Sequence, residues 1–202
     1  MSVSSIAHYF DTQASSWDAT TPDAAHLTRT TTDVAWAAGV QLGTRVLDVG
    51  CGTGVMVPAY LEAGAAEIVG LDVSPNMIEL ACAKFAGCER VHFACCDVLD
   101  FHDTQRFDAL VIFNAYPHFL DKAALVEKAA KLLVPHGRFL VAHSVGREAI
   151  NARHAQVPEG VTSHLDSAAD SAAVWSQHFD IDCLVDTPHC YLFGGTLKAS
   201  IE

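Results

Sequence analysis

The sequence predicts a doubly wound α/β domain: a mostly parallel seven-stranded sheet with an antiparallel hairpin at the carboxyl end and a helical cap at the amino end. Two observations predict this class. From residue 45 onward, continuous apolar runs alternate with segments of helical periodicity, as in a parallel sheet covered on both faces. After residue 142 the alternation stops, and two closely spaced strand-like runs end the chain. With 202 residues, 50% of them hydrophobic, the chain is long enough to bury a core as a single domain.

The first elements make up the cap and the core. Apolar residues at helical spacing predict helices over Ser5–Trp17 and Ala24–Ala38, with a turn at Pro22, so that residues 1–40 form the cap. Residues 44–142 form the core. Its parallel strands are expected at 45–49, 67–71, 91–95, 109–113 and 138–142. Its helices are expected over Thr53–Ala63, from Ser74-Pro75 to Phe85, and from a capping Asp121 to Val134.

The carboxyl-terminal part has a different pattern. Residues 143–180 contain a polar helix over Gly146–His154, a loop over 156–163 and a helix over Ser167–His178. Residues 181–198 form the terminal strand pair, with strands at Ile181–Asp186 and Cys190–Lys198. The hairpin should give an otherwise parallel sheet a mixed edge.

Composition excludes several classes of function. The net charge of −12, without any basic run, argues against nucleic acid as a partner. The seven cysteines are odd in number and form no C-x-x-C pair, which argues against a disulfide framework and a zinc knuckle. No run approaches the roughly 18 apolar residues of a membrane span, and no signal peptide is recognisable. We therefore expect a cytoplasmic protein without a membrane partner.

A glycine-dense turn follows the first strand, at Gly50, Gly52 and Gly54. Without Cβ atoms, the turn lets a ligand approach the backbone and the N–H groups of the following helix start. The dinucleotide fingerprint requires its third glycine at the position of Val55, and no Gly-Lys-Ser/Thr follows for a Walker loop. The alternative interpretation is a tight structural turn without a ligand.

The stretch Asp48-Val49-Gly50-Cys51-Gly52-Thr53-Gly54 resembles the first motif of class I S-adenosylmethionine-dependent methyltransferases. The resemblance runs from Val46 to Arg138 by motif and to Lys198 by strand order. It implies a Rossmann-like methyltransferase fold, S-adenosylmethionine as cofactor and S-adenosylhomocysteine as product. It also implies that the cofactor contacts Asp48, Gly50, Cys51, Gly52 and Gly54.

Two further acidic residues match the family in order. Asp72 ends the second strand, where the family's acidic residue accepts both ribose hydroxyls. Asp97 follows the third strand, where an acidic residue of the family accepts from the adenine amino group. The adjoining Val73 and Val98 are expected to contact the cofactor too. Taken singly, each aspartate is equally well explained as a helix cap.

The amino-terminal stretch with Tyr9-Phe10-Asp11 and Trp17-Asp18 is similar to the helix that begins many small-molecule methyltransferases and closes over the cofactor. The resemblance places Tyr9 and Trp17 over the cofactor. The cysteines Cys51, Cys82, Cys95 and Cys96 are interpreted as packing residues rather than nucleophiles.

Residues that follow the fourth strand are expected to line the acceptor site, because such sites lie at the carboxyl ends of the strands. Asn114 and Tyr116 can hydrogen-bond to a ligand, and Asn114 can also contact the cofactor. His118 is the best-placed general base at neutral pH, unless it only caps a short helix. The order Asn-Ala-Tyr-Pro departs from the Asn-Pro-Pro-Tyr of amino-group methyltransferases, so a nucleobase or amide acceptor is not inferred.

More polar residues follow the fifth strand. His143 ends it and is a third catalytic candidate beside Asn114 and His118. Arg147, Asn151 and His154 share one helix face and are interpreted as a substrate clamp or as a solvated face.

These observations predict methyl transfer from S-adenosylmethionine to a small-molecule acceptor. One alternative is a metal-assisted or non-methylating enzyme that uses His118, His143 and His154, although no metal is assigned. Another is a cofactor-binding module that regulates or scaffolds a partner without turnover. Oxygen, nitrogen, sulfur and carbon acceptors all stay open at this point, as does the oligomeric state.

Overall fold

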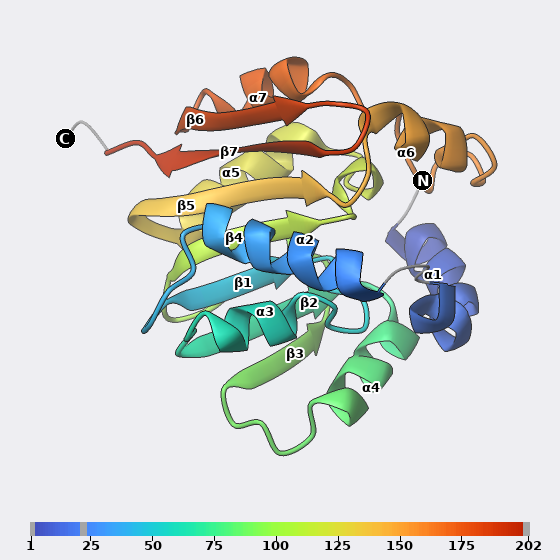
Figure 1. The fold of residues 1–202 in the computed structure, drawn as a ribbon, viewed down its shortest axis with the longest axis horizontal. Helices are drawn as coiled ribbons and strands as arrows, with labels where there is room; N and C mark the ends of the chain where they lie inside the picture. Colours follow the sequence, from blue (N-terminus) through green and yellow to red (C-terminus); the bar gives the residue numbers. More distant parts are fainter. Residues whose placement is uncertain (1–2, 21–23, 200–202) are drawn as a thin grey trace.

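The computed structural model describes residues 3–20 and 24–199, and the predicted turn at Pro22 lies outside them. Its centre is one seven-stranded sheet in the order β3-β2-β1-β4-β5-β7-β6 (Figure 1). Strand β7 is antiparallel to both of its neighbours, and the other pairings are parallel. The predicted mixed sheet with a terminal hairpin is therefore confirmed. The strands are β1 (Arg45–Val49), β2 (Glu67–Asp72), β3 (Val91–Cys95), β4 (Phe107–Phe113), β5 (Leu133–His143), β6 (Phe179–Asp186) and β7 (Tyr191–Leu197).

Helices cover both faces of the sheet. Along β4, Leu110 and Ile112 pack in a core cluster with residues of α5 and α7, whereas Val111 and Phe113 pack in a second cluster with residues of α2 and α3. This burial on both faces explains why β4 is a continuous apolar run. The helices are α1 (Val3–Trp17), α2 (Ala24–Ala37), α3 (Val57–Glu62), α4 (Pro75–Lys84), α5 (Lys122–Leu132), α6 (Arg147–His154) and α7 (Ala168–Trp175), with 3₁₀ turns η1 (Asp18–Thr20) and η2 (Tyr116–His118).

The strand order reverses at the centre of the sheet. From β1 the chain continues outward to β2 and β3, and then returns to β4 and β5 on the other side. A crevice forms beyond the carboxyl ends of strands at such a switch point. Helices α1 and α6 both lie at this edge of the sheet (Figure 1). The fold therefore brings the cap and the carboxyl-terminal segment to the place where a ligand is expected.

Several element boundaries differ from the predictions. Helix α3 begins at Val57 rather than Thr53, because Gly52 and Gly54 have φ of +53° and +82° and the chain is still turning there. Strand β5 begins at Leu133 rather than Arg138: Leu133 already pairs with Phe107, ahead of an irregularity in the register. The predicted caps are confirmed, since Ser74 accepts from the amide of Met77 and Asp121 from that of Ala124. Among the described residues, no helix is long and apolar enough to cross a membrane.

Candidate active site

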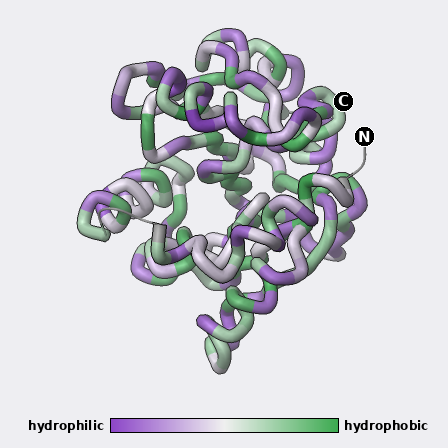
Figure 2. Tube along the Cα trace, turned by 90° about the vertical axis from the view of Figure 1, so that its right-hand side faces the viewer, coloured by the Kyte–Doolittle hydropathy of each residue, from purple (hydrophilic) through white to green (hydrophobic). Residues whose placement is uncertain are grey.

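A cavity of about 590 Å³ lies between the carboxyl ends of the central strands and the cap. This volume is within the range of about 300–1,000 Å³ typical of small-molecule sites. Figure 2 faces this edge of the sheet, where apolar strands lie at the centre and helices of mixed polarity surround them. The predicted site residues in its wall are Tyr9, Trp17, Gly50, Cys51, Gly52, Asp72, Val73, Asp97, Val98, Asn114, His118, His143 and His154.

The glycine turn is held in a conformation that side chains would prevent. Gly50 has φ of +75°, and a Cβ there would lie 2.7 Å from the Cβ of Ala115. The amides of Gly50 and Cys51 both donate to the carbonyl oxygen of Leu71, at 2.8 and 2.9 Å. A Cβ on Gly54 would meet the ring of Phe85 at 2.7 Å, and Gly54 is not among the cavity-lining residues. Glycine at 50 therefore opens the cavity, whereas glycine at 54 permits packing behind it.

Asp72 links the glycine turn to the start of α4. One carboxylate oxygen accepts from the amide of Gly52 and the other from the amide of Ser74, both at 2.9 Å. Each oxygen keeps a second lone pair for a ligand hydroxyl, because a carboxylate accepts about four hydrogen bonds. Asp97 lines the cavity next to Val98, and one of its oxygens accepts from the amide of Leu99 at 2.9 Å. Both aspartates therefore accept from backbone amides of the turns that follow their strands and also line the cavity. Neither is a helix cap, because the N-cap of α4 is Ser74 and the described residues between Asp97 and β4 contain no helix.

Asp48 lies behind the turn rather than in the cavity wall. It is 1% exposed, and neither carboxylate oxygen has a hydrogen-bond partner among the described residues. Burial, reinforced by the nearby charge of Asp72, raises the pKa of Asp48 to about 8. Its side chain is therefore mostly protonated at neutral pH, and it reaches a ligand only through the turn.

The cap is fastened to the cofactor side of the cavity. Asp11 accepts from the hydroxyl of Ser74 at 2.5 Å and from the amide of Asn76 at 3.1 Å. Asp18 accepts from the hydroxyl of Thr53 at 2.6 Å and pairs with Lys84 at 2.7 Å. These contacts, which sequence reasoning did not assign, hold the helix that carries Tyr9 and Trp17, and both residues line the cavity.

Asn114 joins the ends of β4 and β5. It has φ of +55°, a left-handed conformation that asparagine tolerates better than most residues. Its amide N–H donates to the carbonyl of Ala142 at 2.9 Å. Its side-chain oxygen accepts from the amide of Ser144 at 2.8 Å and from the Ser144 hydroxyl at 3.2 Å. The side chain is thus held at the cavity wall by the neighbouring strand end.

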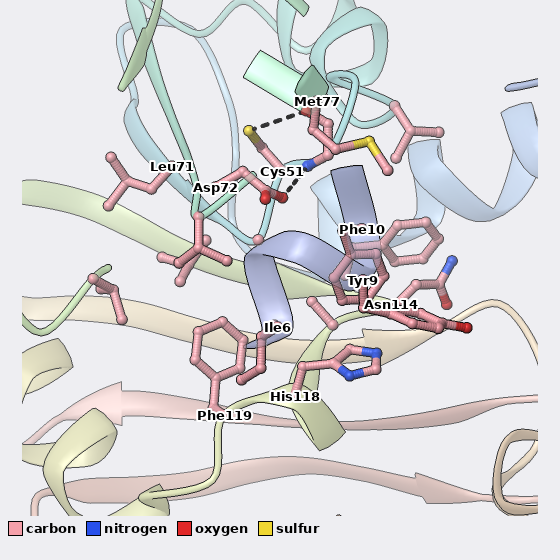
Figure 3. Close-up of a pocket in the computed structure, with 18 of the residues that line it drawn as sticks. Ile6, Tyr9, Phe10, Cys51, Leu71, Asp72, Met77, Asn114, His118 and Phe119 are labelled. Carbon is pink, nitrogen blue, oxygen red and sulfur yellow. Dashed lines mark hydrogen bonds between the residues drawn. The ribbon is translucent and has the colours of Figure 1, made fainter. Parts of the chain in front are cut away.

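His118 follows on the same loop and faces the cap. Its Nδ1 lies 3.0 Å from the carbonyl oxygen of Val161, and Phe10 of α1 packs edge-on against its ring at 4.8 Å (Figure 3). Burial lowers the pKa of His118 to about 4, and the nearby His154 and Lys122 act in the same direction. The imidazole is therefore neutral at pH 7. This bond to a distant loop differs from the helix cap offered as the alternative interpretation.

The other two histidines complete this wall. His143 is 3% exposed, its Nε2 is buried without a partner among the described residues, and burial lowers its pKa to about 3. His154 lies beside His118, with 5.0 Å between ring centroids, and its Nδ1 is 2.9 Å from the hydroxyl of Thr162. Despite this proximity, residues 3–20 and 24–199 contain no group of three or more His, Cys, Asp or Glu suited to a metal ion.

Three predicted substrate residues lie outside the cavity wall and have other partners. The Tyr116 hydroxyl is buried and accepts from Nε1 of Trp175 at 3.2 Å. Arg147 pairs with Asp186 at 3.1 Å. Asn151 makes two hydrogen bonds with the backbone of Leu165, at 2.8 and 3.0 Å. The predicted clamp does not form because Ile150, Arg153 and His154, rather than Arg147 and Asn151, lie on the cavity side of α6.

Lys122 is a residue that no sequence signal indicated. Its ammonium group donates to the carbonyl oxygens of Tyr116 and Phe119, both at 2.5 Å, and lies 4.2 Å from the centroid of the Tyr116 ring. Burial lowers its pKa to about 8. Lys122 therefore holds the η2 turn that carries His118.

Comparison with known proteins tests the predicted family. Residues 46–137 match a family model described as a methyltransferase domain. This region is a methyltransferase domain. An uncharacterized methyltransferase of Schizosaccharomyces pombe is 36% identical over 113 residues, which are 50% of this chain and 38% of that protein. The ubiquinone biosynthesis O-methyltransferase of Neisseria meningitidis is 33% identical over 99 residues, 47% of this chain and 42% of the relative. The chain thus spans about two-fifths of these relatives.

Solved structures show that the fold extends beyond the methyltransferase domain match. The putative methyltransferase in complex with the Trm112 activator of Haloferax volcanii has a TM-score of 0.76 at 19% identity, covering 94% of this chain and 98% of that one. Magnesium protoporphyrin IX methyltransferase from Synechocystis, with bound S-adenosylhomocysteine, has a TM-score of 0.73 at 18% identity, covering 98% and 100%. The predicted resemblance and the Rossmann-like fold are confirmed.

Proposed function

We propose that this protein binds S-adenosylmethionine and transfers its methyl group to a small-molecule acceptor. One observation carries the proposal: the cavity at the switch point is lined by the opened glycine turn, by Asp72, which is hydrogen-bonded to that turn, and by Asp97. Backbone approach suits the amino-acid part of this cofactor, and the two carboxylates suit its ribose and adenine. The residues present therefore fit the group that the methyltransferase domain implies.

The chain's own residues would bind and orient the cofactor and the acceptor and shield them from water. The cofactor supplies a methyl group already activated on a sulfonium, so the protein must hold an acceptor in line and exclude water. Gly50 and Gly52 would hold one end of the cofactor, while Asp72 accepts from ribose hydroxyls and Asp97 from the adenine amino group. The α1 cap, fastened through Asp11 and Asp18, closes this side against solvent.

The other end of the cavity would receive the acceptor. We assign Asn114, His118 and His143 as the catalytic candidates, because all three line it and both imidazoles are neutral at pH 7. The volume of about 590 Å³ suits a cofactor with a small organic partner rather than a macromolecule. The relatives named for ubiquinone biosynthesis support a small-molecule acceptor.

The surroundings of this activity follow from charge and from sulfur chemistry. All seven cysteines are free, which supports a reducing, cytoplasmic location. The net charge of −12 disfavours nucleic acid as a partner. The putative Haloferax methyltransferase was solved in complex with a protein activator, which supports a protein as a second candidate partner of this chain.

Calorimetry with S-adenosylmethionine tests the proposal directly. We expect wild-type protein and the variant Asp100→Ala, a matched exposed aspartate, to bind with similar affinity. Asp72→Ala should bind at least tenfold more weakly, with a thermal melt verifying that it is folded. Absence of binding, or an Asp72→Ala variant equal to wild type, would overturn the cofactor assignment. A cell-extract screen with methyl-labelled cofactor then tests turnover, and binding without any labelled product would favour a non-catalytic module.

A further inference from the structure

The acceptor end of the cavity has a defined hydrogen-bonding polarity, set by two backbone groups. One is the N–H of Ser144 and the other is the C=O of Val161. Each contacts one of two polar side chains that line the cavity beneath α1, Asn114 and His118 (Figure 3). What these side chains offer a ligand follows from the fact that a backbone amide only donates and a carbonyl only accepts.

The first backbone group fixes the amide of Asn114. The atom that faces the Ser144 N–H at 2.8 Å must be the oxygen, because that partner cannot accept. The Ser144 hydroxyl donates a second hydrogen bond to the same oxygen, at 3.2 Å. The Asn114 amide nitrogen makes no hydrogen bond within the described residues, so its two N–H groups are available. At this position the wall of the cavity presents a donor.

The second backbone group fixes the tautomer of His118. The Val161 carbonyl can only accept, so the proton of the neutral imidazole resides on Nδ1 and Nε2 carries a lone pair. The loop that carries Val161 is itself attached to the η2 turn, because both the amide and the hydroxyl of Ser163 donate to the carbonyl of Pro117, at 2.8 and 2.9 Å. Among the described residues, Nε2 has no hydrogen-bond partner. Here the wall presents an acceptor.

We propose that the methyl acceptor is a hydroxyl group on an aromatic ring. This proposal rests on the proposed methyl transfer. A hydroxyl can accept from Asn114 Nδ2 and donate to His118 Nε2 at the same time. A carboxylate has no proton for Nε2. A neutral amine must keep its single lone pair for the methyl, so the Asn114 donor would compete for it. A thiol is a weak partner for both groups.

Two observations support an aromatic ring in the acceptor: the residues that line the cavity and the acidity of a phenol hydroxyl. Phe10 packs against His118, and Phe119, Val145 and Ile150 also line the cavity, an apolar surface that suits a planar ring rather than a sugar. A phenol has a pKa near 10, as tyrosine does, whereas an aliphatic alcohol is far less acidic. A neutral imidazole can therefore share the proton of a phenol as the phenol oxygen attacks the methyl group.

The proposed step balances without a further reagent. As the phenol oxygen forms its bond to the methyl carbon, the O–H proton passes to Nε2 of His118. The electrons of the broken carbon–sulfur bond remain on the sulfur of the cofactor, which becomes a neutral thioether. Asn114 holds the oxygen in line, and the imidazolium then loses its proton to solvent.

The regiochemistry of a mixed acceptor tests the proposal. The full chain would be incubated with methyl-labelled S-adenosylmethionine and with ring-matched one-ring to three-ring phenols, anilines and benzoates, including 2-aminophenol. The neutral amine of 2-aminophenol is intrinsically the better nucleophile, so at least 100-fold more O-methyl than N-methyl product would be diagnostic. Preferential methylation of nitrogen or carboxylate overturns the proposal. So does the absence of any phenol ether when calorimetry shows cofactor binding; in that case cofactor binding itself stands.

Two variants test the polarity of the site. Asn114→Asp replaces the free donor with an acceptor of the same shape, and should lower kcat on the best phenol at least 100-fold. His118→Gln should lower kcat by a similar factor. The remaining kcat of this variant should rise about tenfold per pH unit, because it follows the ionised fraction of the phenol. The control is His164→Gln, whose side chain is 68% exposed. If His118→Gln matches the control in rate and pH profile, the assignment of the base is overturned.

Discussion

The two ends of the cavity are built in different ways. The proposed cofactor end comes from residues 46–98, three consecutive strands and the turns that follow them, and it combines the exposed backbone of the glycine turn with the carboxylates of Asp72 and Asp97. The proposed acceptor end combines Phe10 of α1, the ends of β4 and β5, helix α6 and the 156–163 loop, and its chemistry lies in side chains. The first end should be sensitive to an added Cβ, and the second to hydrogen-bond polarity and charge.

The largest effect is expected at the glycine turn. Gly50→Ala forces a Cβ to 2.7 Å from that of Ala115 at a φ of +75°. Left-handed strain and overpacking together should lower the free energy of unfolding by about 3 kcal/mol. Cofactor affinity should fall at least 100-fold by calorimetry.

The matched control for this variant is Gly87→Ala. Gly87 has a similar φ of +86°, but an added Cβ would meet no atom within 4 Å. It should lose only about 1 kcal/mol, from backbone strain alone. Equal losses in the two urea titrations would contradict the role of close packing at Gly50.

The second effect concerns charge at the acceptor end. The pKa of His143 is about 3 in the folded protein and 6.5 in its ordinary state, so as pH falls the unfolded chain binds this proton first. The stability that neutral His143 contributes is complete above pH 6.5 and is lost progressively toward pH 3. Between pH 7 and pH 5 the loss should be about 2 kcal/mol. In urea titrations, the free energy of unfolding of His143→Leu should change by about 2 kcal/mol less between pH 7 and pH 5 than that of wild type. The exposed control His164→Gln should show the same change with pH as wild type.

The third effect tests whether the cap belongs to the cofactor end. Asp11→Ala removes the hydrogen bonds to Ser74 and Asn76. Charge-assisted bonds of this kind contribute about 1.5 kcal/mol or more, so S-adenosylmethionine should bind about tenfold more weakly. Thr12→Ala is the control, because its hydroxyl bonds to Tyr9 within the same helix. Unchanged cofactor affinity in Asp11→Ala would show that cap closure and binding are independent.

The smallest effect is expected at Arg147. Its partly exposed ion pair with Asp186 should contribute no more than about 0.5 kcal/mol to the free energy of unfolding. Because Arg147 is not among the cavity-lining residues, Arg147→Ala should leave the KM for the acceptor unchanged. A tenfold rise in KM would restore the substrate-clamp interpretation of α6.

The contrast between the two ends also explains what could be predicted. Continuous apolar runs indicated the strands. A strand such as β4 is buried on both faces, so its consecutive residues are all apolar and the pattern is visible within a few positions. The glycine pattern and the positions of Asp72 and Asp97 were likewise local, since each follows its own strand directly. The start of β5 was predicted wrongly, because the strand begins at Leu133 through its pairing with Phe107, a non-local contact.

By itself, the sequence determined the fold class, the methyltransferase domain and the backbone turn that opens the cavity. These depend on periodicity and on φ angles that only certain residues adopt. The tertiary structure decided which side of α6 faces the cavity, and so separated His154 from Arg147 and Asn151. It also decided the tautomer of His118 through Val161 and the orientation of Asn114 through Ser144. Those properties depend on contacts between segments 30 and 43 residues apart, and no local pattern records such contacts.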